Sequence, residues 1–79
     1  MPAITLNGTP QAVPEDTTIV DLVGEAIGRA LGPDGHPLDG GRLGMAVAVD
    51  AVVLPRSRWY RTPVAEGQGI ELITAVQGG

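Results

Sequence analysis

The chain ends in Gly78-Gly79, which places an α-carboxylate on two residues without side chains. A terminal carboxyl group has a pKa of about 3.3–3.7, so it is ionised and nucleophilic at neutral pH. It becomes an electrophile only when one oxygen is converted into a leaving group, as adenylation by ATP does. Glycine has no Cβ and adopts conformations closed to other residues, so this end can thread a narrow channel. The residue types therefore indicate acyl activation at Gly79.

The rest of the composition removes the usual competing chemistry. There is no Cys, which excludes disulfides, thiolate nucleophiles and Cys-ligated metals, and no Lys, which excludes Schiff bases and a P-loop lysine. The net charge of −4 has the wrong sign for binding nucleic acid. No apolar run approaches the roughly 20 residues of a membrane span, and no signal peptide opens the chain. We expect a cytoplasmic protein with no nucleic-acid or membrane partner.

Residues 32–42 form the one stretch with a metal-like composition. His36 lies between Asp34 and Asp39 in a Gly- and Pro-rich segment. The spacing fits neither a zinc site nor an EF-hand. We interpret the aspartates as turn formers and the histidine as solvated, with no metal.

The first half of the chain predicts a hairpin and a helix. Residues 3–7 alternate apolar and polar, Asn7-Gly8 is a turn signal, and residues 11–13 are a short return strand. Thr17 or Thr18 caps a helix that continues in helical period to the stop signal Gly32-Pro33. Gly24 and Gly28 are interpreted as sites of close packing against a sheet.

The second half predicts strands. Residues 44–50 form a buried strand, residues 52–54 a short return strand, residues 56–63 an irregular segment or single helical turn, and residues 70–76 a last strand. Residues 77–79 follow as a flexible tail. In extended form the tail would project about 10 Å, far enough to reach a partner's active site.

This order of elements predicts a single α+β domain over residues 1–79. A hairpin, one main helix and a last strand are the pattern of the β-grasp (ubiquitin-like) fold, a mixed sheet of four to five strands packed on the helix. In that fold the last strand lies centrally beside the first and parallel to it.

Several local sequences then resemble the thiamine-biosynthesis sulfur carrier family. The hairpin of residues 47–53 is followed by Leu-Pro-Arg-Ser-Arg-Trp at residues 54–59, similar to the family's Val-Pro-Arg-x-x-Trp. Residues 66–72 resemble its Asp-Gly-Asp turn into the final strand, and residues 75–79 its Gln-Gly-Gly or Ala-Gly-Gly ending. The chain departs from the pattern in its longer loop at 32–42 and in Asp50-Ala51, which replaces Asn-Gly and makes a type I′ turn less secure.

The resemblance implies a carrier rather than an enzyme, with no cofactor of its own. A partner adenylating enzyme of the ubiquitin-activating type would use ATP to adenylate Gly79. A cysteine desulfurase or persulfide protein would then donate sulfur, which converts the acyl-adenylate of Gly79 into a thiocarboxylate. Thiazole synthase would take that sulfur. Gln77 and Gly78 would thread the partner sites, and apolar residues on the outer face of the sheet would form the main partner surface.

A cluster of arginines around Trp59 has two interpretations. Arg56, Arg58 and Trp59 are of the types enriched at binding hot spots and could dock an acidic partner surface. Alternatively, Trp59 completes a thin core and the arginines around it are solvated.

Three other functions remain open at this point. The small subunit of molybdopterin synthase has the same fold and ending, but the Leu-Pro-Arg…Trp segment disfavours it. A ubiquitin-like modifier would be joined to target lysines. A plain β-grasp interaction module would have an inert tail.

Overall fold

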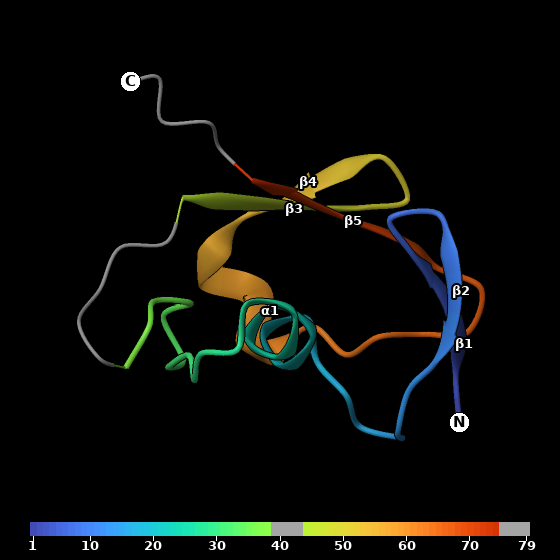
Figure 1. Ribbon diagram of the computed structural model, residues 1–79, viewed down its shortest axis with the longest axis horizontal. Coiled ribbons are helices and arrows are strands. Elements are labelled where there is room, and N and C mark those ends of the chain that lie inside the picture. Colours follow the sequence, from blue (N-terminus) through green and yellow to red (C-terminus); the bar gives the residue numbers. More distant parts are fainter. Residues whose placement is uncertain (39–43, 75–79) are drawn as a thin grey trace.

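The computed structural model describes residues 1–38 and 44–74 of the chain, and Figure 1 shows their arrangement. The elements, in chain order, are β1 (Ala3–Leu6), β2 (Thr9–Ala12), α1 (Ile19–Ile27), β3 (Met45–Val49), β4 (Val52–Leu54), the 3₁₀-helix η1 (Arg56–Arg61) and β5 (Gly69–Thr74). The five strands form one sheet in the order β2-β1-β5-β3-β4. In Figure 1 this sheet curves around α1, which lies against its inner face.

The last strand is central, as predicted. β5 runs parallel to β1, with Thr5 opposite Gly69, and antiparallel to β3, where the register runs from Met45 opposite Thr74 to Val49 opposite Ile70. A sheet with one parallel and several antiparallel pairs, packed on one α-helix, is the α+β β-grasp arrangement. The predicted fold class is confirmed.

The start of α1 is also as predicted. Thr18 is the N-cap: its hydroxyl accepts a hydrogen bond from the Asp21 backbone N–H, and the Asp21 carboxylate accepts one from the Thr18 N–H at 3.0 Å. This reciprocal capping box satisfies two helix-terminal donors. Among the residues that the structure describes, no helix is long and apolar enough to cross a membrane.

The end of α1 differs from the prediction. The helix stops at Ile27 rather than at Gly32-Pro33, because Gly28 adopts a left-handed φ of 70° as C-cap. The N–H groups of Gly28 and Arg29 both donate to the carbonyl of Gly24, which completes the last turn. A Cβ on Gly24 would lie 2.9 Å from the Arg29 carbonyl oxygen. Gly28 thus terminates the helix and Gly24 leaves room for the Arg29 carbonyl, and a Cβ at either position would not meet the sheet, so the predicted role in packing against the sheet was wrong.

The core lies between α1, η1 and the inner face of the sheet. Its largest fully buried side chains are those of Trp59, Ile19, Ile70, Val23 and Val47. Trp59 is the one aromatic residue in this cluster, and the other members are aliphatic. Because the core is small, the single indole supplies a large share of its buried apolar surface.

Both hairpins close with two-residue turns of the same hand. Asn7 and Gly8 have φ values of 51° and 82°, and Asp50 and Ala51 have φ values of 50° and 68°. Positive φ at both central positions is the type I′ geometry, whose twist matches that of the flanking strands. The turn therefore forms at Asp50-Ala51 despite the absence of glycine, and Ala51 has a backbone conformation that its Cβ disfavours.

We predict that Ala51→Gly raises the free energy of unfolding by about 1 kcal/mol, because glycine adopts positive φ without the steric cost of a Cβ. Gly8→Ala provides the reciprocal control: a Cβ added at Gly8 would have no atom within 4 Å, so only the φ of 82° opposes the substitution. Urea unfolding should show opposite shifts of similar size. Equal stabilities for wild type and Ala51→Gly would contradict the interpretation.

Candidate functional site

The predicted reactive end follows β5, so the structural question is how firmly this strand is held. Gln77, Gly78 and Gly79 lie outside the described residues. Within them, β5 is paired on both sides: the Thr5 N–H donates to the Gln68 carbonyl at 3.0 Å and the Asn7 N–H to the Ile70 carbonyl at 2.9 Å, while β3 pairs along the other edge. The first half of β5 is thus held on both edges, and its second half is held by β3 up to Thr74, which gives the following residues an ordered starting point.

Two turn side chains reinforce the hold on β5. The Asn7 Oδ1 accepts a hydrogen bond from the Leu72 N–H, and the Asp50 Oδ1 accepts one from the Gly69 N–H, both at 2.8 Å. The Asp50 N–H in turn donates to the Gly69 carbonyl at 2.7 Å. The second hairpin turn therefore holds the start of the central strand, and the first holds its middle. The sequence identifies Asn7 and Asp50 only as turn residues, because nothing local indicates which strand their side chains meet.

The outer face of the sheet carries an apolar patch made of Ala46, Ala48, Val53 and Ile73. The register places Ile73 opposite Ala46 and Val53 opposite Ala48, so all four side chains point to the same side. Val53 is 67% exposed and Ile73 is 49% exposed, whereas Ala48 is 6% exposed and contributes little accessible surface. Glu71, opposite Ala48, places a carboxylate on the same face, so the patch is small and has a charged neighbour. The resemblance implied a partner surface on this face without naming residues, and these are the apolar ones that the structure places there.

Two of the three predicted docking residues face the interior. Trp59 is 1% exposed, and its Nε1 donates to the Leu54 carbonyl at 3.1 Å. The Arg56 guanidinium lies over the indole, 4.8 Å from the ring centroid, and donates to the carbonyls of Gly35 at 3.2 Å and Met45 at 3.0 Å. Arg56 thus joins η1 to the loop after α1 and to the start of β3, and Trp59 joins it to the end of β4.

Arg58 lies on a different side of η1 and is exposed. The structure therefore does not bring Arg56, Arg58 and Trp59 together on one accessible surface. A docking role for Arg58 stays a prediction. The same role for Trp59 would require the indole to leave the core.

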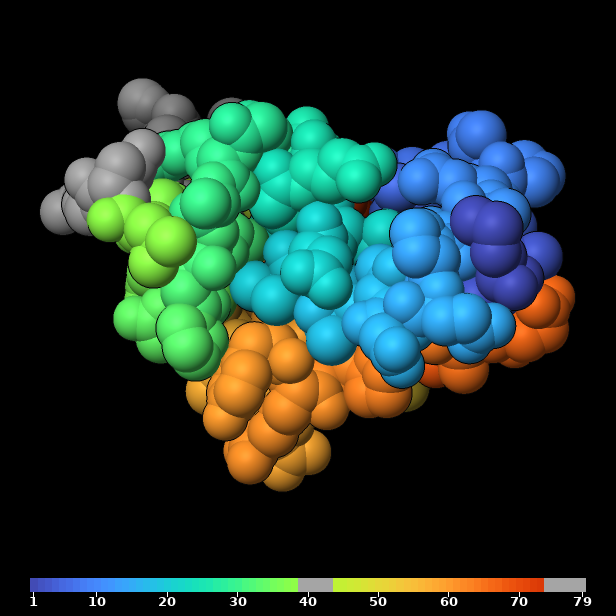
Figure 2. Space-filling view, turned by 90° about the horizontal axis from the view of Figure 1, so that it is seen from below, coloured from blue at the N-terminus to red at the C-terminus, as the bar shows by residue number. Residues whose placement is uncertain are grey.

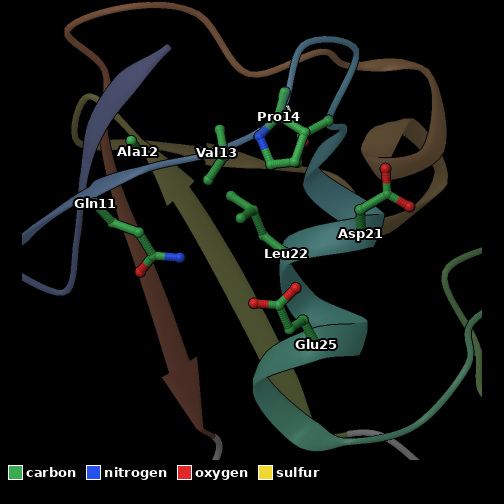
Figure 3. Close-up of a pocket in the computed structure, with 8 residues that line it drawn as sticks. Gln11, Ala12, Val13, Pro14, Asp21, Leu22 and Glu25 are labelled. Carbon is green, nitrogen blue, oxygen red and sulfur yellow. Dashed lines mark hydrogen bonds between the residues drawn. The ribbon is translucent and has the colours of Figure 1, made fainter. Parts of the chain in front are cut away.

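A hollow between β2 and α1 is visible in the close-up of Figure 3. Gln11 of β2 and Glu25 of α1 extend into it, above the apolar side chains of Val13 and Leu22. The Asp21 carboxylate at its rim is already engaged in the capping box, and the Thr17 hydroxyl donates to the Pro14 carbonyl at 2.7 Å. The lining contains no His or Arg, and its Thr17 hydroxyl already donates to the backbone, so we assign it no catalytic role.

The loop after α1 is built as a turn in its described part. The Asp34 Oδ1 accepts a hydrogen bond from the His36 N–H at 2.9 Å, and Leu31 pairs with Pro37. Asp34 is thus a turn former, as predicted, whereas Asp39 lies outside the described residues. In residues 1–38 and 44–74, no group of three or more His, Cys, Asp or Glu side chains is placed to hold a metal ion.

Comparison with known proteins agrees with this geometry. The family model described as the ThiS family matches residues 4–79. Among solved structures, the crystal structure of the thiamine biosynthesis protein ThiS from Geobacter metallireducens is similar, with a TM-score of 0.66 and 23% sequence identity over 98% of this chain and 99% of that one. At that identity the structure supports the fold alone. No curated protein sequence gives a significant match.

Proposed function

The chain belongs to the ThiS family, the small sulfur carriers of thiamine biosynthesis, and on that basis we propose that Gly79 carries the sulfur atom as a C-terminal thiocarboxylate. The observation that carries the proposal is the family match, which extends through residue 79, together with a central strand that is held on both sides along its first half and pairs with β3 up to Thr74. A sulfur carrier is a substrate for other enzymes. It needs a reactive end and a stable body rather than an active site of its own.

The chemistry proceeds in two balanced steps. A Gly79 carboxylate oxygen attacks the α-phosphorus of ATP, which gives the acyl-adenylate and pyrophosphate. A sulfide ion (HS⁻) then attacks the carbonyl carbon, the C–O bond to the phosphate breaks, and AMP leaves. With a persulfide donor the same attack gives an acyl disulfide, and a second thiol must then cleave its S–S bond to release the thiocarboxylate and form a disulfide with the donor. The terminus then contains sulfur in place of one oxygen. The adenylating enzyme binds the ATP, so the carrier itself holds no cofactor.

The length of the tail fits a reaction inside a partner's active site. Five residues follow Thr74, and an extended segment of that length spans at most about 17 Å. The reactive carbon can therefore enter a deep channel while the folded body stays at its mouth. The apolar patch of Ala46, Ala48, Val53 and Ile73 supports docking of the body, because β5 contributes both the patch residue Ile73 and the start of the tail.

Three partners follow from this chemistry: the adenylating enzyme, a sulfur donor that is a cysteine desulfurase or persulfide protein, and thiazole synthase as the acceptor. The alternative acceptor is the large subunit of molybdopterin synthase. Sulfur transfer from the loaded chain to a pterin precursor, but not to thiazole synthase, would assign the carrier to that second pathway.

The direct test is the intact mass of the chain. Incubation with ATP, sulfide and a purified bacterial adenylating enzyme of thiamine synthesis should replace one oxygen by sulfur, and omission of ATP should prevent the change. Fragmentation should locate the sulfur at Gly79. An unchanged mass in the complete mixture, with a known carrier loaded in parallel, would refute the proposal.

A further inference from the structure

The end of β5, where the tail begins, depends on the first residue of β3. The last pair of opposite residues in the sheet is Met45 of β3 with Thr74 of β5, and we call it the terminal pair. Figure 1 shows the start of β3 beside the end of β5. The pairing with β1 ends at Ile70, so beyond that point β3 is the strand that pairs with β5. The starting point of the tail is therefore only as fixed as Met45.

The terminal pair has no backbone hydrogen bond of its own. Hydrogen-bonded and non-hydrogen-bonded pairs alternate along antiparallel strands. The Asp50 N–H donates to the Gly69 carbonyl, so the first pair is hydrogen-bonded, and in the same register the terminal pair is not. The Leu72 N–H agrees with this alternation, because it points away from β3 to a side chain of the first turn. The Met45 carbonyl therefore points away from β5, toward the edge of β3 on which β4 lies.

The side chain of Arg56 provides the partner that this carbonyl needs. β4 ends at Leu54, opposite Val47, and the chain enters η1 at Arg56. Had β4 continued in register, Arg56 would lie opposite Met45 and its backbone N–H would donate to the Met45 carbonyl. Instead, the Arg56 Nη2 donates to that carbonyl at 3.0 Å. The guanidinium thus occupies the place in the hydrogen-bond ladder that β4 leaves open.

The surroundings of Arg56 hold its guanidinium in this place. The side chain is half-buried, its Nη1 donates to the Gly35 carbonyl at 3.2 Å, and the guanidinium lies 4.8 Å from the centroid of the Trp59 ring. Gly35 is buried with a φ of 79°, and a Cβ there would overlap the Arg56 Cγ. In Figure 2 the segment after α1, in green, lies beside the segment that contains η1, in orange. The loop after α1 therefore fits closely against this arginine.

We propose that Arg56 is a positioning residue for the reactions of the tail: through the Met45 carbonyl it keeps the terminal pair closed, so that the tail starts from a fixed point. This inference rests on the proposed function. A tail that starts from a frayed strand samples more directions, so a smaller fraction of docked carriers has its terminus in the partner's active site. Arg56 acts through the sheet and needs no contact with the partner.

The structural part of the test is amide hydrogen exchange of Arg56→Met, which keeps an apolar stem over Trp59 and removes both donors. The Ile73 amide belongs to the last hydrogen-bonded pair, with Ala46. We expect it to exchange at least about 10-fold faster than in the wild type, as loss of a hydrogen bond from a charged donor predicts. The Glu71 amide, in the preceding hydrogen-bonded pair, should change much less. Equal acceleration of both amides would indicate a general loss of stability and would overturn the proposal.

The functional part measures ATP–pyrophosphate exchange with the same bacterial adenylating enzyme over a range of carrier concentrations. We expect Arg56→Met to lower kcat about 10-fold with KM near the wild-type value, because the docked body is unchanged and fewer termini are in place. The defect should persist at high salt, since it does not arise from exposed charges. The matched control is Arg61→Met, which makes the same substitution at an exposed position of η1 and should leave both constants unchanged.

Three kinetic results would contradict the positioning role. They are a wild-type kcat for Arg56→Met, a raised KM with unchanged kcat, and an equal loss of kcat in Arg61→Met. Should Arg56→Met not fold, Arg56→Lys is measured in its place, because it keeps the charge but has one nitrogen where the wild type has the two that bind Gly35 and Met45. Wild-type kcat and wild-type exchange of the Ile73 amide in that variant would equally overturn the proposal.

The two proposals fail in different ways. If the wild-type chain supports no ATP–pyrophosphate exchange while a known carrier does, the proposed function fails, although hydrogen exchange at Ile73 still reports whether Arg56 holds the terminal pair. If the wild type is adenylated and Arg56→Met is adenylated with the same kcat, only the positioning proposal fails.

Discussion

Removal of Gly79 is expected to abolish sulfur loading and to leave the stability of the domain unchanged. The deletion moves the terminal carboxylate back along the chain by about 3.5 Å. Displacement of a reacting group by even 1 Å can cost about 100-fold in rate, so the shortened chain should be adenylated at least that much more slowly. Intact mass measurement over a time course gives the rate, and thermal unfolding gives the stability.

A matched variant separates chain length from glycine chemistry. Gly79→Ala keeps the carboxylate at its place in the sequence and adds only a Cβ. Its loading rate should fall below that of the wild type, because the methyl group must fit into the partner's channel, but should exceed the rate of the deletion. Loading of the shortened chain at the wild-type rate would show that the terminal carboxylate of Gly79 is not the site. Loss of stability on deletion would show that the tail is part of the folded body.

Replacement of the buried indole should have the largest effect on stability. Trp59→Ala is expected to lower the free energy of unfolding by about 3–5 kcal/mol, the range for large-to-small changes of a buried aromatic. The side chain is 1% exposed, donates to the Leu54 carbonyl and supports the Arg56 guanidinium. Since a domain of this size has a total stability of roughly 4–12 kcal/mol, the variant should be partly unfolded at moderate temperature.

Tyr60→Ala is the control for this substitution, because Tyr60 is the adjacent aromatic residue and is 45% exposed. Its cost should stay below about 1 kcal/mol, as expected for truncation of a surface side chain. Trp59→Phe should fall between the two, because it keeps most of the apolar contact and loses the N–H donor to Leu54. Urea midpoints measure all three. Equal midpoints for Trp59→Ala and Tyr60→Ala would show that the indole does not hold the core.

Where the signals were local, the sequence predicted the structure closely. The capping pair Thr18 and Asp21 marks the start of α1, and Val52–Leu54 is a strand with the expected bounds. The return strand of the first hairpin begins earlier than predicted, at Thr9, and includes Pro10. That proline is tolerated because β2 is an edge strand, which does not need every backbone donor.

Other features were not indicated by the periodicity of the sequence or by residue type. The helical period of the sequence continues past Ile27, but the hydrogen bonds to the Gly24 carbonyl stop α1 at Gly28. Likewise, residue type does not tell whether Arg56 or Arg58 is engaged by the rest of the fold. The structure separates them, because one guanidinium meets carbonyl groups from the loop after α1 and from β3 whereas the other faces solvent.

The chemistry expected of this protein was predicted from its sequence. The Gly78-Gly79 ending behind a predicted strand, in a chain without Cys or Lys, indicates an activatable terminal carboxylate, and the resemblance of residues 54–59, 66–72 and 75–79 to a known family implies that it carries sulfur. How the body supports that end could be read only from the folded chain. The clamps of Asn7 and Asp50 on β5, the apolar patch around Ile73 and the burial of Trp59 all join residues far apart in the sequence. Such pairings depend on the register of the sheet and on how η1 packs on α1, neither of which is encoded in any one segment.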